Sequence, residues 1–327
     1  MTMICFEIQA NGSRQIVADL AYRSPESARE LAVRLCNPAG GIGADGFVAI
    51  QLHDRKTCVV APYTPDGNEP ALCVNGGIAA AIFHYRIYRQ PMLRIEISGR
   101  LYDVTLTEGP TFLEIGFAGI PITFRGSRRF QKASADYSVS VALPRLGASV
   151  KGSFCDVLTP QLIIERSMIE DEALNRLGQS MNSQTDVFPI GINISEFKPL
   201  SDEGFFVRTF ERGGAGLSAS CSSAMVAVIA TLCEMGTVEP ETTIPAYSLN
   251  GRCGIRILRT NEPAAYLGTI CTRGALESIW SVSRTQRTLE CHRVSRENGP
   301  VAAMEAMAAR ELTDLNARHF FKPGVAM

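Results

Sequence analysis

The chain has 327 residues, of which 46% are hydrophobic and 20% are charged, and its formal net charge is -1. This length is enough for two ordinary domains, and the charge balance argues against a broad electrostatic contact with nucleic acid or an anionic membrane. The longest apolar stretches, 76–83 and 224–233, are too short to span a bilayer. The ten cysteines form no CxxC pair and no export signal is evident, so we expect a cytoplasmic protein with free thiols and no metal site.

Short segments rich in β-branched and apolar residues predict strands along the whole chain. The first half has them at residues 3–8, 16–20, 46–51, 57–61, 93–97 and 102–107. The second half has them at residues 153–157, 161–165, 191–197, 204–209, 254–258, 267–271 and 278–282. We expect residues 118–129 to cross between the halves, and the polar residues after 283 to form an outer tail with a helix at 300–317.

Helical patterns fall at comparable places in the two halves. Residues 24–36 start with a serine cap, a proline and a glutamate, and they predict an amphipathic helix. Residues 74–89 and 222–235 are apolar on nearly all sides, which predicts two helices buried within rings of strands. Each of these buried helices begins directly after a cysteine, Cys73 in the first half and Cys221 in the second.

We interpret this pattern as a weak internal repeat, in which a shell of strands, a cysteine and a buried helix occur twice. The first predicted domain covers residues 1–120, carries Cys73 and is completed by about 272–327. The second predicted domain covers residues 121–271 and carries Cys221.

The two cysteines stand where a thiolate could be stabilised. A helix N-terminus carries unpaired N–H groups and a partial positive charge, which attract anions and lower the pKa of a nearby thiol. Two such helix starts facing each other could hold one carboxylate, with a sulfur on each side of the neighbouring carbon. One thiolate would remove the α-proton from one face while the opposite thiol protonates the other face, and the centre would invert without a cofactor. Taken singly, each cysteine could equally be a small buried residue.

Five segments along residues 1–283 resemble, in order, sequence blocks of the diaminopimelate epimerase family of cofactor-independent amino-acid racemases and epimerases. They are GIGADG at 41–46, YTPDGNEPALCVNGG at 63–77, DVLTPQ at 156–161, FPIGIN at 188–193 and RTFERGGAGLSASCSSAM at 208–225. The resemblance marks the chain as a divergent member. It implies an α+β fold of two pseudo-symmetric domains, each a β-barrel-like shell around a central helix, and a homodimer.

The same resemblance implies the roles of the site residues. Cys73 and Cys221 are the paired base and acid, with no cofactor. The substrate carboxylate and amino group lie near the backbone of Val74, Asn75, Ser222 and Ser223. The distal part of the substrate is bound by Asn193, Glu211 and Arg212. Of these, Arg212 suits a carboxylate and Glu211 suits an ammonium.

Several positions depart from the family pattern. An asparagine of the family corresponds to Ser13, with Asn11 two residues away as a substitute, and two further asparagines correspond to Thr64 and Thr159. The family's glutamine is Gly46 and its histidine is replaced by Gln161, while Val74 adds bulk beside the reacting carboxylate. A pocket that loses such partners binds a second amino-acid head group poorly. These changes favour a substrate other than diaminopimelate, such as histidine.

Three functions therefore stay open at this point. The leading one is a racemase or epimerase that inverts the α-carbon of a small amino-acid substrate with Cys73 and Cys221. The second is a carboxylic-acid isomerase of the proline racemase or phenazine-pathway type. The third is a non-catalytic homologue that binds an amino acid or a protein partner.

Overall fold

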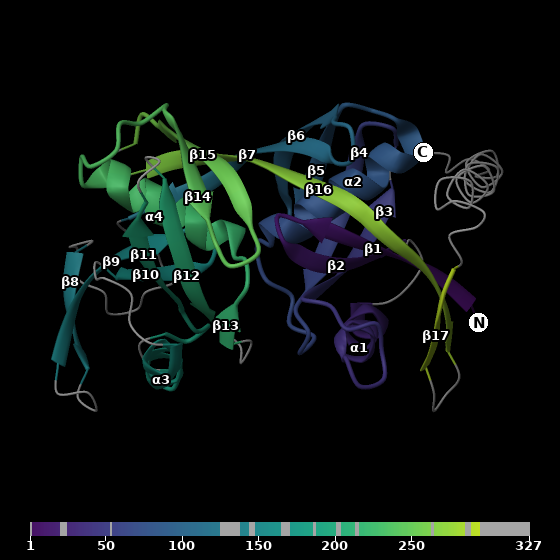
Figure 1. Cartoon of the computed structure of the whole chain (residues 1–327), viewed down its shortest axis with the longest axis horizontal. Helices are drawn as coiled ribbons and strands as arrows, with labels where there is room; N and C mark the ends of the chain where they lie inside the picture. The colour runs from purple at the N-terminus through teal and green to yellow at the C-terminus, as the bar shows by residue number, and fades with distance from the viewer. Residues whose placement is uncertain are drawn as a thin grey trace, which may run out of the picture.

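The computed structural model describes residues 2–19, 25–52, 54–124, 138–143, 148–164, 171–185, 188–200, 204–212, 216–262, 265–284 and 289–294. Figure 1 shows two lobes side by side, each with one helix inside its strands and a second helix on its outer surface. Within the described residues no helix is long and apolar enough to cross a membrane.

The first lobe is a closed ring of strands, in which each strand pairs with its neighbour and the last pairs back with the first. In their order around the ring, the strands are β1 (Thr2–Ala10), β2 (Ser13–Asp19), β3 (Gly46–Leu52), β4 (Thr57–Tyr63), β5 (Met92–Ile97), β6 (Arg100–Glu108), β7 (Leu113–Thr123) and β16 (Ala265–Arg284). The ring surrounds helix α2 (Val74–Tyr88), which is buried on every side along most of its length.

The second lobe closes in the same way around helix α4 (Ser222–Glu234). Its ring begins at β7, ends at β16 and closes through the β7–β16 pairing. Between them lie β9 (Ala148–Asp156), β10 (Pro160–Ile164), β11 (Asn193–Pro199), β12 (Phe205–Glu211), β14 (Thr243–Tyr247) and β15 (Arg252–Arg259).

The two rings repeat one topology. In each, an antiparallel pair is followed by a parallel, an antiparallel, a second parallel and a further antiparallel pair. A parallel pair needs a crossover, and helices supply it. The outer helices α1 (Pro25–Cys36) and α3 (Asp171–Asn182) make the first crossover of each lobe, and α2 and α4 make the second. The predicted fold of two pseudo-symmetric shells, each around a central helix, is confirmed.

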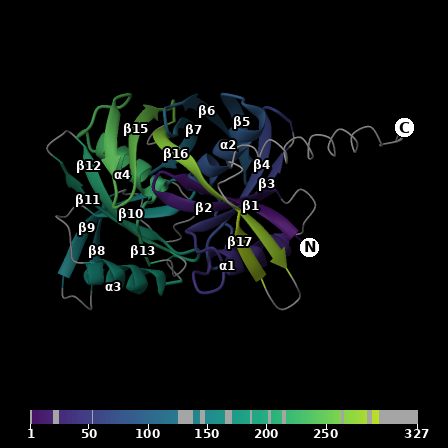
Figure 2. The ribbon, with the colours of Figure 1, turned by 45° about the vertical axis from the view of Figure 1, so that its right-hand side comes forward.

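Strands β7 and β16 belong to both rings. Strand β16 is 20 residues long: its first half pairs with β15 and its second half with β1, as Figure 2 shows from the side of β1. A division into residues 1–120 and 121–271, with 272 onward returning to the first unit, remains our proposal for the domains, and its boundary falls inside β7.

The structure refines two predictions about connections. The predicted crossover at 118–129 is, as far as Thr123, the end of strand β7, because these residues pair with β16. The polar segment after 283 is more than a tail, since β17 (Leu289–Arg293) pairs with β16. The helix expected at 300–317 lies outside the described residues. Two further strands extend the sheets, β8 (Ser138–Leu143) beside β9 and β13 (Gly216–Ser218) beside β12.

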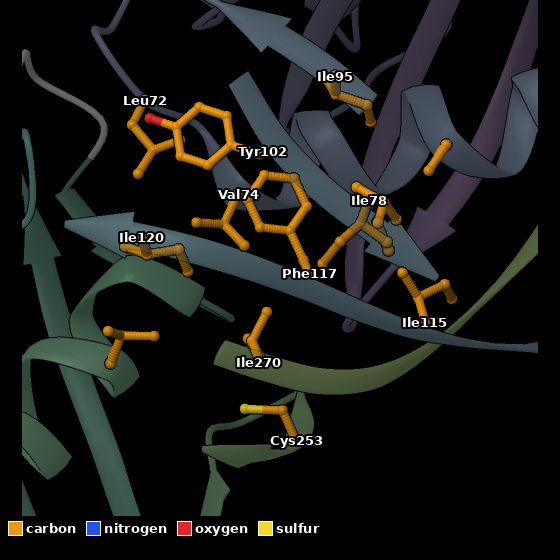
Figure 3. Packing of buried hydrophobic residues seen from close by; sticks show 14 of the residues in the cluster. Leu72, Val74, Ile78, Ile95, Tyr102, Ile115, Phe117, Ile120, Cys253 and Ile270 are labelled. Carbon is orange, nitrogen blue, oxygen red and sulfur yellow. The ribbon is translucent and has the colours of Figure 1, made fainter. Parts of the chain in front are cut away.

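One hydrophobic core runs through both lobes, because the shared strands carry apolar side chains at their junction. Figure 3 shows Phe117 of β7 between Val74 and Ile78 of α2 on one side and Ile270 of β16 on the other. The Phe117 ring stacks on Tyr102 of β6 with 5.2 Å between centroids. Helices α2 and α4 therefore pack on the same hydrophobic core, and this packing fixes the positions of their N-termini relative to each other.

Candidate active site

A cavity of about 850 Å³ opens between the two lobes, and both helix starts reach it. Twelve of the thirteen site residues expected from the sequence line it: Ser13, Thr64, Cys73, Val74, Asn75, Thr159, Asn193, Glu211, Arg212, Cys221, Ser222 and Ser223. The exception is Asn11, which is buried behind the cavity wall. Cys73 and Cys221, far apart in the sequence, thus share one enclosure.

Cys73 is the N-cap residue of α2. Its backbone is extended, with φ −129° and ψ 101°, which leaves the sulfur beside the first turn of the helix. The Gly76 amide donates to Cys73 Sγ at 3.3 Å, and the Gly77 amide donates to the Cys73 carbonyl at 2.9 Å. The sulfur is therefore held by backbone donors alone among the described residues.

Cys221 is the N-cap residue of α4 and has nearly the same backbone, with φ −119° and ψ 99°. Its surroundings differ from those of Cys73 because side chains contact the sulfur. The thiol donates a hydrogen bond to the Glu211 carboxylate, and the Ser223 hydroxyl lies 3.4 Å from Sγ. The two sulfurs are thus chemically unequal: Cys221 has a carboxylate as its proton acceptor, and Cys73 has none in the part of the chain that the structure describes.

The helix starts also present amides toward the cavity. The first N–H groups of any helix have no acceptor within the helix. Apart from the amides that contact the two sulfurs, those of Val74, Ser222 and Ser223 have no acceptor among the described residues, and all three residues line the cavity. Such converging donors and the partial positive ends of two helices form a site for a carboxylate.

Burial controls the acidity of both thiols. Burial raises the pKa of Cys73 to about 11, although the Gly76 and Asn75 amides act against it, and the Glu211 charge adds to the rise. Burial also raises the pKa of Cys221 well above its usual range, with the Glu211 charge as the second cause. The helix starts were expected to lower the pKa of these thiols, and the structure shows the opposite direction because desolvation outweighs the amides.

This balance predicts how Cys73 reacts with iodoacetamide. A thiol whose pKa is about 11 is ionised in about one molecule in 10⁴ at pH 7, so alkylation should be slow there. The rate should rise about tenfold per pH unit from pH 7 to 10 and level only near pH 11, as measured by mass spectrometry of the Cys73 peptide. In urea the same peptide should level near pH 9. A folded-state midpoint at pH 9 or below would contradict the account.

The raised pKa also couples to stability, with a definite sign. Between pH 9 and 11 the unfolded chain releases the Cys73 proton while the folded chain keeps it. The folded state is then the one that binds more protons, so the contribution of Cys73 to the free energy of unfolding falls as pH rises through this window.

A buried hydrogen-bond network joins the two helix starts. Asn75 Nδ2 donates to the Ser220 carbonyl at 3.2 Å, and the Ser222 hydroxyl donates to Asn75 Oδ1. Asn11 Nδ2 in turn donates to Ser222 Oγ at 2.7 Å, and Thr272 of β16 donates to Asn11 Oδ1. Asn11 therefore ties the first lobe to the start of α4, which explains its position outside the cavity.

The wall that carries Asn193 and Arg212 is built from the second lobe. Asn182, the last residue of α3, accepts from the Ile192 amide at 2.8 Å and donates to the Ile192 carbonyl at 2.9 Å. This clamp fixes the loop before Asn193, whose Oδ1 accepts from the Arg212 amide at 3.0 Å. The Arg212 guanidinium also donates to the Ile190 carbonyl. Glu211 and Arg212 are thereby held at the end of β12.

Glu211, the last residue of β12, lines the cavity and is hydrogen-bonded to Cys221. Burial raises the pKa of Glu211, while hydrogen bonds from Cys221 and Ser218 act in the opposite direction. The negative charge of Asp45 adds to the rise, and the positive charge of the Arg212 guanidinium opposes it. Asp45 belongs to the first lobe, so charges from both lobes act on one another across the cavity.

The wall of the first lobe contains Thr64 and the turn that follows it. The Thr64 amide donates to the Asn68 carbonyl, 2.9 Å away, and the Thr64 hydroxyl donates to Asp66. Gly67 closes this turn with φ +82°, a conformation that favours glycine. The segment is thus both an ordinary turn and part of the cavity lining.

Several lining residues were not expected from the sequence. Gln15, Asp45 and Ser218 line the cavity, as do Asp66 and Glu69. Asp45 could have been found, because it lies within the GIGADG block at 41–46. Gln15 could not, because its part in the cavity depends on the pairing of β2 with β3, where it stands opposite Gly46.

No family model matches the chain. It is 26% identical over 231 residues to a diaminopimelate epimerase of Clostridium acetobutylicum, covering 69% of this chain and 68% of the relative. It is 27% identical over 246 residues to a diaminopimelate epimerase of Listeria monocytogenes, covering 70% and 71%.

Solved structures share the fold at lower identity. A hydroxyproline epimerase from Agrobacterium vitis, solved with bound trans-4-hydroxy-L-proline, has a TM-score of 0.64 and 13% identity, covering 92% of this chain and 97% of that one. A phenazine biosynthesis protein of Bacillus anthracis has a TM-score of 0.60 and 13% identity, covering 87% and 100%.

These relatives and the two-shell fold define the chain as an isomerase of the epimerase and racemase type. More closely, it is a divergent homologue of the diaminopimelate epimerases, which confirms the resemblance found in its sequence blocks.

Proposed function

We propose that the chain is a cofactor-independent racemase or epimerase that inverts the α-carbon of an amino acid with Cys73 and Cys221 as its two bases. One observation carries the proposal: both cysteines cap buried helices whose first turns line the same cavity. Two acid–base groups on opposite faces of one carbon are what inversion requires.

In this mechanism the substrate carboxylate binds the helix-start amides of Val74, Ser222 and Ser223. The α-ammonium pairs with Glu211, a change from the distal role expected from the sequence, because Glu211 is hydrogen-bonded to Cys221 at the reacting centre. One sulfur, as thiolate, takes the α-proton, and the electron pair left on the α-carbon spreads into the carboxylate. The amides bind that added charge more strongly than the ground state, which lowers the barrier. The opposite thiol then protonates the other face, so that the two sulfurs exchange protonation states.

The raised thiol pKa values suit activation by the substrate. Glu211 is one of the causes that raise the pKa of both cysteines, and an ammonium bound to Glu211 would cancel its charge. Substrate binding should therefore make a thiolate easier to form, at the time when a base is needed.

The cavity favours a substrate other than diaminopimelate. Ser13, Thr64 and Thr159 offer short hydroxyls where the family resemblance implies longer carboxamides, and the Thr64 hydroxyl is already bonded to Asp66. A distal amino-acid head group would find fewer partners here. Racemisation of another amino acid, such as histidine, is therefore the preferred form of the proposal.

The test is to incubate the purified protein in D₂O with diaminopimelate and, separately, with single L-amino acids. Nuclear magnetic resonance follows loss of the α-proton, and chiral chromatography follows inversion. The proposal expects both changes with at least one substrate. Deuterium uptake at the α-carbon without inversion would oppose the two-base racemase and favour proton transfer of the carboxylic-acid isomerase type. Binding without any exchange would support the non-catalytic homologue.

We also propose a cytoplasmic homodimer. All ten cysteines are free in the structure, which suits a reducing compartment. Light scattering on the eluted protein measures its mass, and a single monomer peak at micromolar concentration would overturn the dimer.

A further inference from the structure

Gln15 occupies the space that a side chain at position 46 would fill. The two residues are opposite one another on the parallel strands β2 and β3. A Cβ atom added at Gly46 would lie 2.5 Å from Gln15 Oε1, much closer than two such atoms can approach. The Gln15 carboxamide, from the neighbouring strand, thus fills the space that a side chain at position 46 would occupy.

The orientation of this carboxamide is fixed by a hydrogen-bond relay. Ser13 Oγ donates to Asp45 Oδ2, so it must accept from Gln15, whose Nε2 lies 2.8 Å away. Gln15 Oε1 therefore points away from Ser13 and has no partner among the described residues. Gln15 lines the cavity, and the residue as a whole is only 3% exposed.

Asp45 is an exposed residue that shares the Ser13 hydroxyl with Gln15 and adds a negative charge to this wall of the cavity. Its Oδ2 accepts from the Arg14 amide at 2.8 Å and from Ser13, and its Oδ1 has no partner among the described residues. The cavity lining as a whole holds the carboxylates of Asp45, Asp66, Glu69 and Glu211 against the guanidinium groups of Arg29 and Arg212. Gln15 Oε1 and the Asp45 carboxylate are both acceptors, so a cation that carries N–H groups would satisfy both, whereas an anion would be repelled by the Asp45 charge.

We propose that Gln15 Oε1 and Asp45 form a subsite for the cationic side chain of the substrate, so that the substrate class is an α-amino acid with an ammonium, guanidinium or imidazolium side chain. This inference rests on the proposed function and specifies its substrate. The α-carboxylate stays at the helix starts, and the side chain extends to the wall of the first lobe.

The experiment compares α-proton exchange in D₂O for L-lysine, L-ornithine, L-arginine and L-histidine with that for L-norleucine and L-glutamate. At least one cationic amino acid should exceed both others in kcat/KM by about tenfold or more, the size expected of a hydrogen bond to a charged group. Faster exchange of norleucine or glutamate would overturn the subsite while leaving the proposed function intact.

Calorimetric titration of the same amino acids separates the two hypotheses when no exchange occurs. Preferential binding of the cationic amino acids without exchange would refute the proposed function and support the subsite. Absence of both exchange and preference would overturn both.

The variant Gly46→Ala tests the position of Gln15 directly. Its added methyl group must displace Gln15 Oε1, the flexible end of a side chain, so the fold should persist. We expect KM for the best cationic substrate to rise about tenfold with kcat little changed, and KM for norleucine to stay the same. The matched control is Gly40→Ala, where a Cβ meets nothing within 4 Å.

Asp45→Asn is a second variant that tests the same subsite if the Gly46→Ala protein does not fold. It removes the charge and retains an oxygen that can accept from Ser13 and the Arg14 amide. It should raise KM for the cationic substrate by about tenfold or more and change KM for norleucine much less, because norleucine meets Asp45 only through its effect on Glu211. Equal effects on both substrates would mean that Asp45 acts on the structure of the wall and would overturn the subsite.

Discussion

Replacing either Cys73 or Cys221 by serine should lower the rate of inversion by about 10³-fold or more, while the protein stays folded. A hydroxyl is far less acidic than a thiol, so the base on that face is lost, and a positioned general base contributes about 10² to 10⁴ in rate. Both sulfurs line the cavity, so each substitution acts on the site itself. Chiral chromatography of the substrate identified in the exchange experiment measures the effect.

The matched control is Cys271→Ser, because Cys271 is exposed on β16 and does not line the cavity. Its activity should equal that of the unmodified protein. If one of the two cavity cysteines tolerated serine with less than about a tenfold loss, the two-base mechanism would be wrong and a single-base isomerase would be favoured.

Gly178→Ala should lower the free energy of unfolding by about 2 to 3 kcal/mol. Gly178 of α3 faces the ring of Phe210, and an added Cβ would lie 2.2 Å from two ring atoms. The ring is buried, so it cannot swing aside as a flexible chain end would. Phe210 directly precedes Glu211 on β12, and its displacement should also weaken activity. Urea unfolding followed by circular dichroism measures the loss.

Gln179→Ala is the control for this change, since it introduces the same residue at an exposed position of the same helix. It should alter the stability by about 0.5 kcal/mol or less. If the Gly178→Ala protein were as stable as the unmodified protein, the prediction would be wrong. Helix α3 would then be able to move away from β12 and make room for the added methyl group.

The helices that carry the cysteines could be predicted because their sequences are apolar all around. Helix α3 was missed, although Leu174, Leu177 and Met181 recur on one face, because Gly178 in its interior disfavours a helix and few apolar residues mark the pattern. The roles of β7 and β16 could not be predicted. Each strand pairs with segments of both rings, and sequence periodicity carries no information about such partners.

Part of the site could be predicted from sequence blocks, and the rest depends on strand pairing and burial. The blocks around Cys73 and Cys221 indicated the helix starts, and the structure brings both to one cavity. Gln15 was missed because its relation to Gly46 arises only from the pairing of β2 with β3. The acidity of the thiols was predicted wrongly because the sequence shows the helix N-terminus, which lowers the pKa, and hides the depth of burial, which raises it.

The isotopic content of both enantiomers at low conversion in D₂O tests the two-sulfur mechanism most directly. When one sulfur removes the proton and the other delivers a solvent deuteron, the inverted product should carry deuterium at its α-carbon while the remaining substrate keeps its proton. Mass spectrometry after chiral separation reads both. Deuterium appearing equally in substrate and product from the start would contradict the two-sulfur mechanism, because a single group would then serve both faces.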